Sequence, residues 1–261
     1  MVEGVESLRI QRLDGGERHE FIDALAVESA ATIVLNGQEI ATMACSPSYL
    51  RCLGAGYLLS EGMVSGKEMI REITVGEGQI PIRIKLVADV SFTVDPSGGK
   101  TQVVSGCGKG TALVCRGIDL PKGVESNIRV SFEQVLLAVR AFHQLSDIYR
   151  ETGGVHSAAL SDGNEPLVFM EDISRHSAVD KVFGACVLGD ICTSDKLLLT
   201  SGRISSDLVI KAARMGVPII VSRSAPTTLA VKTACDLGVT LAGFVRGKRM
   251  NVYSHAWRVT A

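Results

Sequence analysis

The sequence predicts an α/β protein in which a small N-terminal α+β domain precedes a larger domain of alternating strands and helices. In the first part, Asn36-Gly37 lies between runs of β-branched residues at 31–43, a pattern typical of a β-hairpin. From residue 155 onward, short apolar runs alternate with helical patterns, which indicates a mixed, mostly parallel sheet covered by helices. The 261 residues are enough for two cores. We therefore assign residues 1–105 to the first domain and 106–261 to the second.

The first domain is predicted to be built on hairpins with one helix. After the two strands of residues 31–43, apolar residues recur at helical spacing over 47–62, and Pro47 is tolerated in the first turn of a helix. Two more strands are expected at 70–75 and 80–88. These elements together predict a small sheet with a helix packed on it.

The second domain is predicted to begin with a long helix. Ser131 is a favourable N-cap, and the helical pattern after it continues until just before Gly153-Gly154. The alternation of strands and helices starts there. Strands are expected at 155–161, 166–171, 196–200, 218–222 and 240–244, with helices at 175–188, 205–215 and 227–237.

The composition excludes several classes of protein. The 27 basic and 28 acidic residues give a net charge of -1, so no overall field favours nucleic acid. Seven cysteines at irregular spacing argue against a disulfide framework. No apolar run approaches the roughly 20 residues of a membrane span, and the first residues lack the pattern of a signal peptide. We expect a cytoplasmic protein with reduced thiols, no nucleic-acid partner and no membrane span.

Three predicted strands of the second domain end in similar sequences. Each is followed by an arginine and a hydroxyl side chain at the point where a helix begins. Ligands of open α/β sheets bind at this edge, where helix N-termini offer free N–H groups and arginines suit phosphate oxygens. One such junction is ordinarily a helix cap, but three of them and a basic turn favour a ligand with several phosphates. The segments are Asp172-Ile173-Ser174-Arg175-His176, Ser201-Gly202-Arg203, Ser222-Arg223-Ser224 and the turn Phe244-Val245-Arg246-Gly247-Lys248-Arg249.

Acidic and histidine side chains gather around the first junction. His176 and Asp180 are four residues apart and share a helix face with Asp172 nearby, while His156 lies at a predicted strand start. This spacing permits a structural hydrogen bond, an acid/base pair or two metal ligands. A metal-assisted hydrolase is therefore one alternative. The chain contains no CxxC pair, no zinc-deaminase spacing, no phosphate-binding loop and no serine-hydrolase elbow.

The segment VVSGCGKGTALVC at 103–115 presents a single thiol between glycines. Free cysteines usually behave as small buried hydrophobes, but Gly106 and Gly108 leave Cys107 unshielded, and Lys109 favours its thiolate. These neighbours indicate a thiol that is presented to a partner.

Long motifs spread over nearly the whole chain resemble the FdhD/NarQ family of formate dehydrogenase accessory sulfurtransferases. They are VESAATIVLNG (27–37), LLSEG (58–62), TGGVHSAAL (152–160), EDISRHSAVDKVFG (171–184), SGRISSDLVIKAARMGVPIIVSRSAPTTLAV (201–231) and GFVRGKRMNVYS (243–254).

The resemblance implies a fold and an activity. The expected C-terminal domain is a three-layer domain similar to cytidine deaminases but without their zinc. The expected protein is a homodimer that takes sulfur from a cysteine desulfurase as a persulfide. It passes this sulfur to the molybdenum bis(pyranopterin guanine dinucleotide) cofactor of formate dehydrogenase, and a GDP-like nucleotide is expected to occupy the place of that cofactor.

The resemblance also assigns residues. Cys107 corresponds to the persulfide-bearing cysteine, whereas Gly110 stands where the family has the second cysteine of a CxxC motif. The family places cofactor contacts in the basic turn 244–249. The alternative function is a chaperone that binds the cofactor and transfers no sulfur; both functions predict the pocket, and only sulfur transfer requires Cys107.

Overall fold

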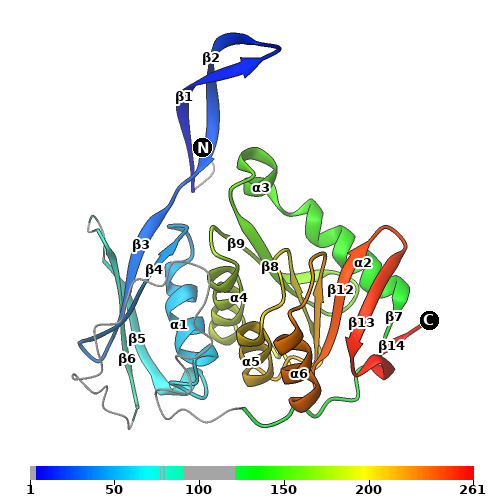
Figure 1. The fold of residues 1–261 in the computed structure, drawn as a ribbon. Coiled ribbons are helices and arrows are strands. Elements are labelled where there is room, and N and C mark those ends of the chain that lie inside the picture. The colour runs from blue at the N-terminus through cyan, green and yellow to red at the C-terminus, as the bar shows by residue number, and fades with distance from the viewer. Residues whose placement is uncertain (1–3, 77, 79, 91–120) are drawn as a thin grey trace.

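Two sheets with helices packed between them make up the body of the protein. The computed structural model describes residues 4–76, 78, 80–90 and 121–261 of the chain. Figure 1 shows a small sheet at one side, a larger sheet at the other, and a thin hairpin that projects from the body. Among the described residues, no helix is long and apolar enough to cross a membrane.

The small sheet confirms the predicted hairpin. Its strand order is β4-β3-β6-β5, from β3 (Ser29–Leu35), β4 (Gln38–Cys45), β5 (Ile70–Val75) and β6 (Ile82–Ala88). The turn between β3 and β4 is Asn36-Gly37, and both residues have positive φ (49° and 84°), as this hairpin turn requires. Helix α1 (Leu50–Ser60) covers one face through Leu53 and Leu58. A short 3₁₀ turn, Lys67–Met69, precedes β5.

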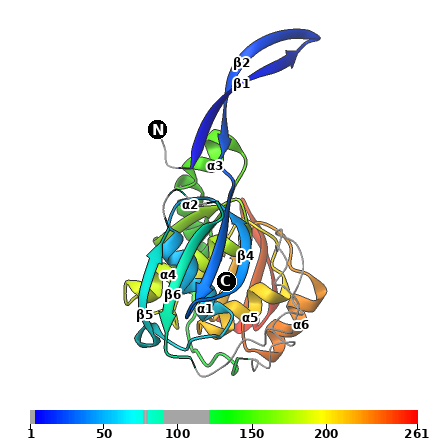
Figure 2. The same cartoon turned by 90° about the vertical axis from the view of Figure 1, so that its left-hand side faces the viewer.

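The projecting hairpin was not among the expected elements. It consists of β1 (Val5–Asp14) and β2 (Glu17–Ala26), which pair with each other only and form a two-stranded sheet. Gly15 and Gly16, with φ of 57° and 92°, make its turn. Figure 2, a view turned by 90° from Figure 1, also shows the hairpin projecting away from the body.

The large sheet is mixed, as predicted, but fewer of its neighbouring strand pairs are parallel than expected. Its order is β13-β12-β11-β10-β8-β9, and only the pairs β10–β11 and β11–β12 are parallel. β8 is antiparallel to β9 and to β10, and β13 is antiparallel to β12. β9, β10, β11 and β12 nevertheless run in the same direction. The strands are β8 (His156–Ser161), β9 (Pro166–Asp172), β10 (Leu197–Thr200), β11 (Ile219–Ser222), β12 (Thr240–Arg246) and β13 (Arg249–Ser254).

Helices cover both faces of the large sheet and give it three layers. α4 (Arg175–Leu188), α5 (Ser206–Arg214) and α6 (Thr228–Asp236) bury one face in a core with Leu160, Leu198 and Ile220. α2 (Phe132–Gln144) buries the other face through Val135 and Phe142. Outside the layers, β7 (Val130–Ser131) pairs with β14 (Val259–Thr260), which follows the 3₁₀ turn Ala256–Arg258. The expected likeness to cytidine deaminases stays a prediction.

The long helix predicted after Ser131 is two helices. Ser131 caps α2 with the reciprocal bonds of a capping box, but the chain turns at Leu145 and continues as α3 (Asp147–Thr152). The buried Glu171 carboxylate accepts hydrogen bonds from the backbone N–H groups of Ile148 and Tyr149, 3.1 and 3.2 Å away. A side chain from β9 therefore stabilises a second helix start.

The two halves of the chain meet at α1 and α4, where backbone touches backbone. A β-carbon on Gly56 would lie 1.7 Å from the carbonyl oxygen of Asp180, and one on Gly184 would lie 1.9 Å from that of Cys52. Only glycine fits at either position. The predicted domain boundary at 105/106 lies outside the described residues.

Candidate functional site

One edge of the large sheet collects the three predicted junctions. Because β9, β10, β11 and β12 run in the same direction, their carboxyl ends meet there, and β8 begins at the same edge. We call this the carboxyl edge. Helices α4, α5 and α6 start directly above it, so their free N–H groups point toward the same region.

The β9–α4 junction is held from inside by Asp172. This carboxylate is fully buried and lies 2.6 Å from Nζ of the equally buried Lys181. It also accepts hydrogen bonds from the backbone N–H groups of Ser174 and Ser46, at 2.8 and 3.1 Å. Burial raises the pKa of Asp172, and Lys181 opposes this shift. Asp172 therefore connects the end of the small sheet to the carboxyl edge.

At the β10–α5 junction, two arginines surround a neutral histidine. Ser201 Oγ accepts a hydrogen bond from the Ser157 N–H at 3.0 Å and lies 3.2 Å from His156 Nδ1. Burial lowers the pKa of His156, and the nearby charges of Arg175 and Arg203 lower it further. The side chain of Arg175 packs over Gly202, since a β-carbon there would be 3.0 Å from it.

At the β11–α6 junction, a serine connects two of the loops. The buried Ser222 hydroxyl donates to the Gly202 carbonyl at 2.7 Å and accepts from the Ser224 N–H at 2.9 Å. Arg223 is exposed and its Nη1 lies 3.4 Å from Nε2 of His143, at the end of α2. Burial and the Arg223 charge lower the pKa of His143 to about 4.

The turn between β12 and β13 completes the edge. The Phe244 N–H donates to the Ser224 carbonyl at 3.1 Å, and Arg246 Nε donates to the Arg223 carbonyl at 3.2 Å. Gly247, Lys248 and Arg249 follow at the exposed tip. The carboxyl edge thus presents exposed basic side chains from three loops, namely Arg203, Arg223, Arg246, Lys248 and Arg249.

Some of the predicted contact residues lie inside the protein. Asp172 and Val245 are fully buried, Val245 in the core beneath α2, and Ser222 is 1% exposed. Their side chains shape the loops from beneath, and the contact of these three residues with a ligand stays a prediction.

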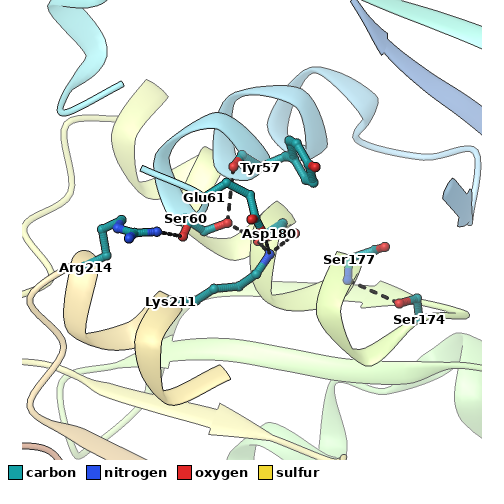
Figure 3. A network of polar contacts seen from close by, with 8 residues as sticks. All are labelled: Tyr57, Ser60, Glu61, Ser174, Ser177, Asp180, Lys211 and Arg214. Atoms are coloured by element: carbon teal, nitrogen blue, oxygen red, sulfur yellow. Dashed lines mark hydrogen bonds and ion pairs between the residues drawn. The ribbon is translucent and has the colours of Figure 1, made fainter. Parts of the chain in front are cut away.

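Asp180 belongs to a separate buried network between α1, α4 and α5 (Figure 3). Nζ of Lys211 lies 2.8 Å from both carboxylate oxygens of Asp180 and 3.2 Å from Glu61. The Ser60 hydroxyl donates to Asp180 at 2.6 Å, and Arg214 donates to the Ser60 carbonyl at 2.8 Å. Burial raises the pKa of Asp180, and Lys211 opposes the shift. The network joins the end of α1 to the second half of the chain.

These ion pairs remove support from the hydrolase alternative. Asp172 and Asp180 are each paired with a lysine ammonium group, so neither carboxylate is available to a metal ion. In the described part of the chain, no group of three or more His, Cys, Asp and Glu side chains could hold a metal.

Three side chains near the carboxyl edge were not among the site residues predicted from the sequence. His143 gives no signal in the sequence beyond its place near a helix end. Ser205 and Asp207 read as ordinary residues of a helix start. One buried oxygen of each, Ser205 Oγ and Asp207 Oδ1, has no hydrogen-bond partner. The same is true of Nε2 of His176. Burial lowers the pKa of His176 to about 3, helped by Lys211, Arg175 and His156.

Cys107 and its glycine-rich neighbours lie outside the described residues. In the part of the chain that the structure describes, the cysteines Cys45, Cys52, Cys186, Cys192 and Cys235 are free thiols.

The chain is similar to known proteins both in sequence and in structure. The chain is 38% identical over 251 residues to sulfur carrier protein FdhD from Staphylococcus aureus strain MRSA252, covering 96% of this chain and 94% of that protein. The same holds for the protein of that name from strain Newman. A crystal structure described as a formate dehydrogenase accessory protein, from Desulfotalea psychrophila, matches with a TM-score of 0.81 and 29% identity, covering 98% and 99% of the two chains. The model of the FdhD/NarQ family matches residues 26–260, and the chain therefore belongs to this family.

Proposed function

We propose that this protein is a sulfur carrier that delivers sulfur for the maturation of formate dehydrogenase. The observation that carries the proposal is the carboxyl edge, where exposed arginines of three loops stand together in a chain 38% identical to sulfur carrier proteins. The name of the structural relative supports formate dehydrogenase as the client.

The substrate that suits this edge is the molybdenum bis(pyranopterin guanine dinucleotide) cofactor. Its phosphates need charge-assisted hydrogen bonds, and Arg203, Arg223 and Arg246 supply exposed guanidinium groups of the right kind. The starts of α4, α5 and α6 add free N–H groups. A GDP-like nucleotide is expected to occupy part of the same place.

Sulfur loading requires one thiol. The Cys107 thiolate attacks the outer sulfur of a persulfide on a cysteine desulfurase, so a new S–S bond forms on Cys107. The S–S bond of the desulfurase breaks at the same time, and its cysteine leaves as a thiolate. Lys109 stabilises the Cys107 thiolate before this exchange and the persulfide anion on Cys107 after it. Gly110 means that the loaded sulfur is not displaced by a second cysteine at that position.

The remaining partners follow from the same proposal. The protein works with a cysteine desulfurase and with formate dehydrogenase, as a homodimer in the cytoplasm. The alternative is a cofactor-binding chaperone. It is supported by Gly110, which stands where the family motif has its second cysteine. The two functions differ in their need for Cys107.

Mass spectrometry after incubation with a cysteine desulfurase and cysteine tests sulfur loading. The wild-type chain should gain one sulfur atom, and Cys107→Ala should gain none while it still binds GDP and fails to activate formate dehydrogenase. Cys192→Ala is the matched control, because Cys192 is an exposed thiol whose pKa is lowered by a hydrogen bond from Ser194. Normal activation by Cys107→Ala would leave the chaperone as the function.

A further inference from the structure

One face of the hairpin of β1 and β2 carries a continuous apolar surface. Alternate residues of a strand point to the same face, and the register sets Ile10 directly opposite Phe21 on this one. Leu8 precedes Ile10 on the same face, and Leu25 lies diagonally across from Leu8. Ile10 is half-buried and the other three side chains are exposed. The hairpin face, as we call it, consists of Leu8, Ile10, Phe21 and Leu25.

The opposite face of the hairpin has no such continuity. Its two exposed large apolar side chains, Leu13 and Ile22, are separated by the opposed pair of Gln11 and Glu20. An ion pair crosses this face, with Arg9 Nη1 3.4 Å from the Glu20 carboxylate. Single apolar side chains on a surface are ordinary, whereas a contiguous patch indicates an interaction site. The hairpin face is therefore the side on which a partner fits.

The hairpin needs a further layer. A two-stranded hairpin alone is only marginally stable in water, and stability requires more strands or a packed apolar face. Among the described residues, β1 and β2 pair only with each other, and Figures 1 and 2 show them projecting from the body. Their ten residue pairs contain no bulge and their sequences no proline, two features that usually protect exposed strands. The hairpin thus has the form of an arm that packs on another molecule.

The charges at the two ends of the hairpin face identify a second copy of this chain as that molecule. Glu6 precedes Leu8 on the side of the body, and Arg12 follows Ile10 on the side of the tip. The Arg12 guanidinium lies over the Phe21 ring, 3.4 Å from its centroid. A twofold axis reverses the direction of the face, so the basic end of one copy meets the acidic end of the other. With the axis between Leu8 and Ile10, these two side chains pack on each other across the contact, and Glu6 meets Arg12 of the second copy.

We propose that the hairpin face binds the hairpin face of a second copy, so that two hairpins form a small four-stranded sandwich. This inference rests on the homodimer of the proposed function, because it names the surface through which the two copies associate. Ten strand residues span about 33 Å and two strands lie about 5 Å apart, so each face covers well under the roughly 800 Å² per partner of a standard interface. The dimer therefore dissociates on dilution.

Sedimentation velocity at a series of protein concentrations measures the association. The wild-type chain should pass from monomer to dimer as the concentration rises, and a chain that starts at Val27 should remain monomeric. Leu8→Glu should weaken the association at least about tenfold, because it places a carboxylate without a partner in the middle of the contact. The matched control is Ile22→Glu, which adds the same charge at a more exposed position on the opposite face and should associate as the wild type does.

An exchange of charges tests the direction of the two hairpins. Glu6→Arg should weaken the association, because it brings two arginines together across the contact. Glu6→Arg combined with Arg12→Glu should restore it, since opposite charges face each other again. A double variant as weak as Glu6→Arg alone would show that the proposed arrangement is wrong.

The remaining outcomes separate this inference from the proposed function. If the chain from Val27 associates like the wild type, or if Leu8→Glu and Ile22→Glu weaken the association equally, the hairpin face is not the contact. The homodimer of the proposed function then stands on another surface. If the wild-type chain stays monomeric at every concentration, this inference and the homodimer both fail, whereas sulfur loading on Cys107 is decided by the mass measurement alone.

Discussion

The arginines of the carboxyl edge were predictable because their spacing follows strand ends. Arg175, Arg203 and Arg223 each come within three residues of the end of a strand in the large sheet. Strands that run in the same direction must end at one edge, so their positions in the fold followed from the order of elements.

Replacing Arg203 by alanine should weaken GDP binding at least about tenfold, because a hydrogen bond to a charged group contributes about 1.5–3 kcal/mol. Calorimetric titration measures the loss. Lys196→Ala removes a cation just before β10, at the opposite edge of the sheet, and should bind GDP as the wild type does. Equal effects of both changes would mean that overall charge, and not the site, sets the affinity.

His176 should make the protein sensitive to acid. Its pKa of about 3 lies below the ordinary value of 6.5, so the folded state resists protonation and the unfolded state does not. Stability from this group is complete above pH 6.5 and is lost as the pH falls toward 3, by at most about 1.4 kcal/mol per pH unit. In denaturant unfolding at several pH values, His176→Phe should lose less stability than the wild type over this range. If the free energy of unfolding fell equally with pH in both proteins, His176 would not be a buried neutral histidine.

Other residues of the site could not be predicted from the sequence. Lys181 and Lys211 read as exposed charges of two helices, yet they are 0% and 5% exposed, because carboxylates on neighbouring elements pair with them inside the protein. Ser205 and Asp207 differ from ordinary residues of a helix start only because one buried side-chain oxygen of each has no hydrogen-bond partner. Such features depend on packing between segments far apart in the chain, which local pattern does not encode.

At the scale of elements, the strands and helices predicted after residue 155 agree with the structure within about two residues, whereas β13 and β14 were not predicted. The apolar periodicity was sufficient for these elements, and the turn chemistry of Asn36-Gly37 was sufficient for the hairpin of β3 and β4. Prediction failed where tertiary contacts override local pattern. The Glu171 carboxylate interrupts the long helix, and the hairpin of β1 and β2 has its signal in Gly15-Gly16 but no third strand to pair with.

The contact of α1 with α4 should not tolerate a methyl group. Gly184→Ala gains about 1 kcal/mol of helix propensity, but its β-carbon would overlap the Cys52 carbonyl, which rigid backbone cannot avoid. We expect a net destabilisation of about 1–3 kcal/mol or more, measured by denaturant unfolding.

The control for this substitution is Gly123→Ala, where the nearest atom would be 3.9 Å from the new β-carbon. That variant should unfold like the wild type. A Gly184→Ala chain of unchanged or raised stability would show that the two helices separate at little cost.

At the scale of the whole molecule, the hairpin of β1 and β2 is an appendage of a body that is complete without it. Leu13 and Ile22 are 68% and 65% exposed, so the hairpin buries little apolar surface against the body. It contacts the body near α3, where Ala26 lies against Gly154, and the Val27 N–H donates to the Gly4 carbonyl at the base of the hairpin. The family model also begins at residue 26.

A chain that starts at Val27 should therefore fold and bind GDP as the full chain does. Thermal unfolding and calorimetry of the two chains measure this. A large drop in the unfolding temperature of the shortened chain would show that the hairpin is part of the cooperative unit.

The glycine contact between α1 and α4 has a consequence for synthesis. About 115 residues separate the end of α1 at Ser60 from the start of α4 at Arg175. At about 5–20 residues per second, a ribosome needs about 6–23 s to make them. Throughout this interval, the emerging chain carries α1 with its bare glycine face and its unpaired Glu61 and Ser60. The first half of the protein must therefore wait for its partner helix, and a chaperone can bind this helix before α4 has been made.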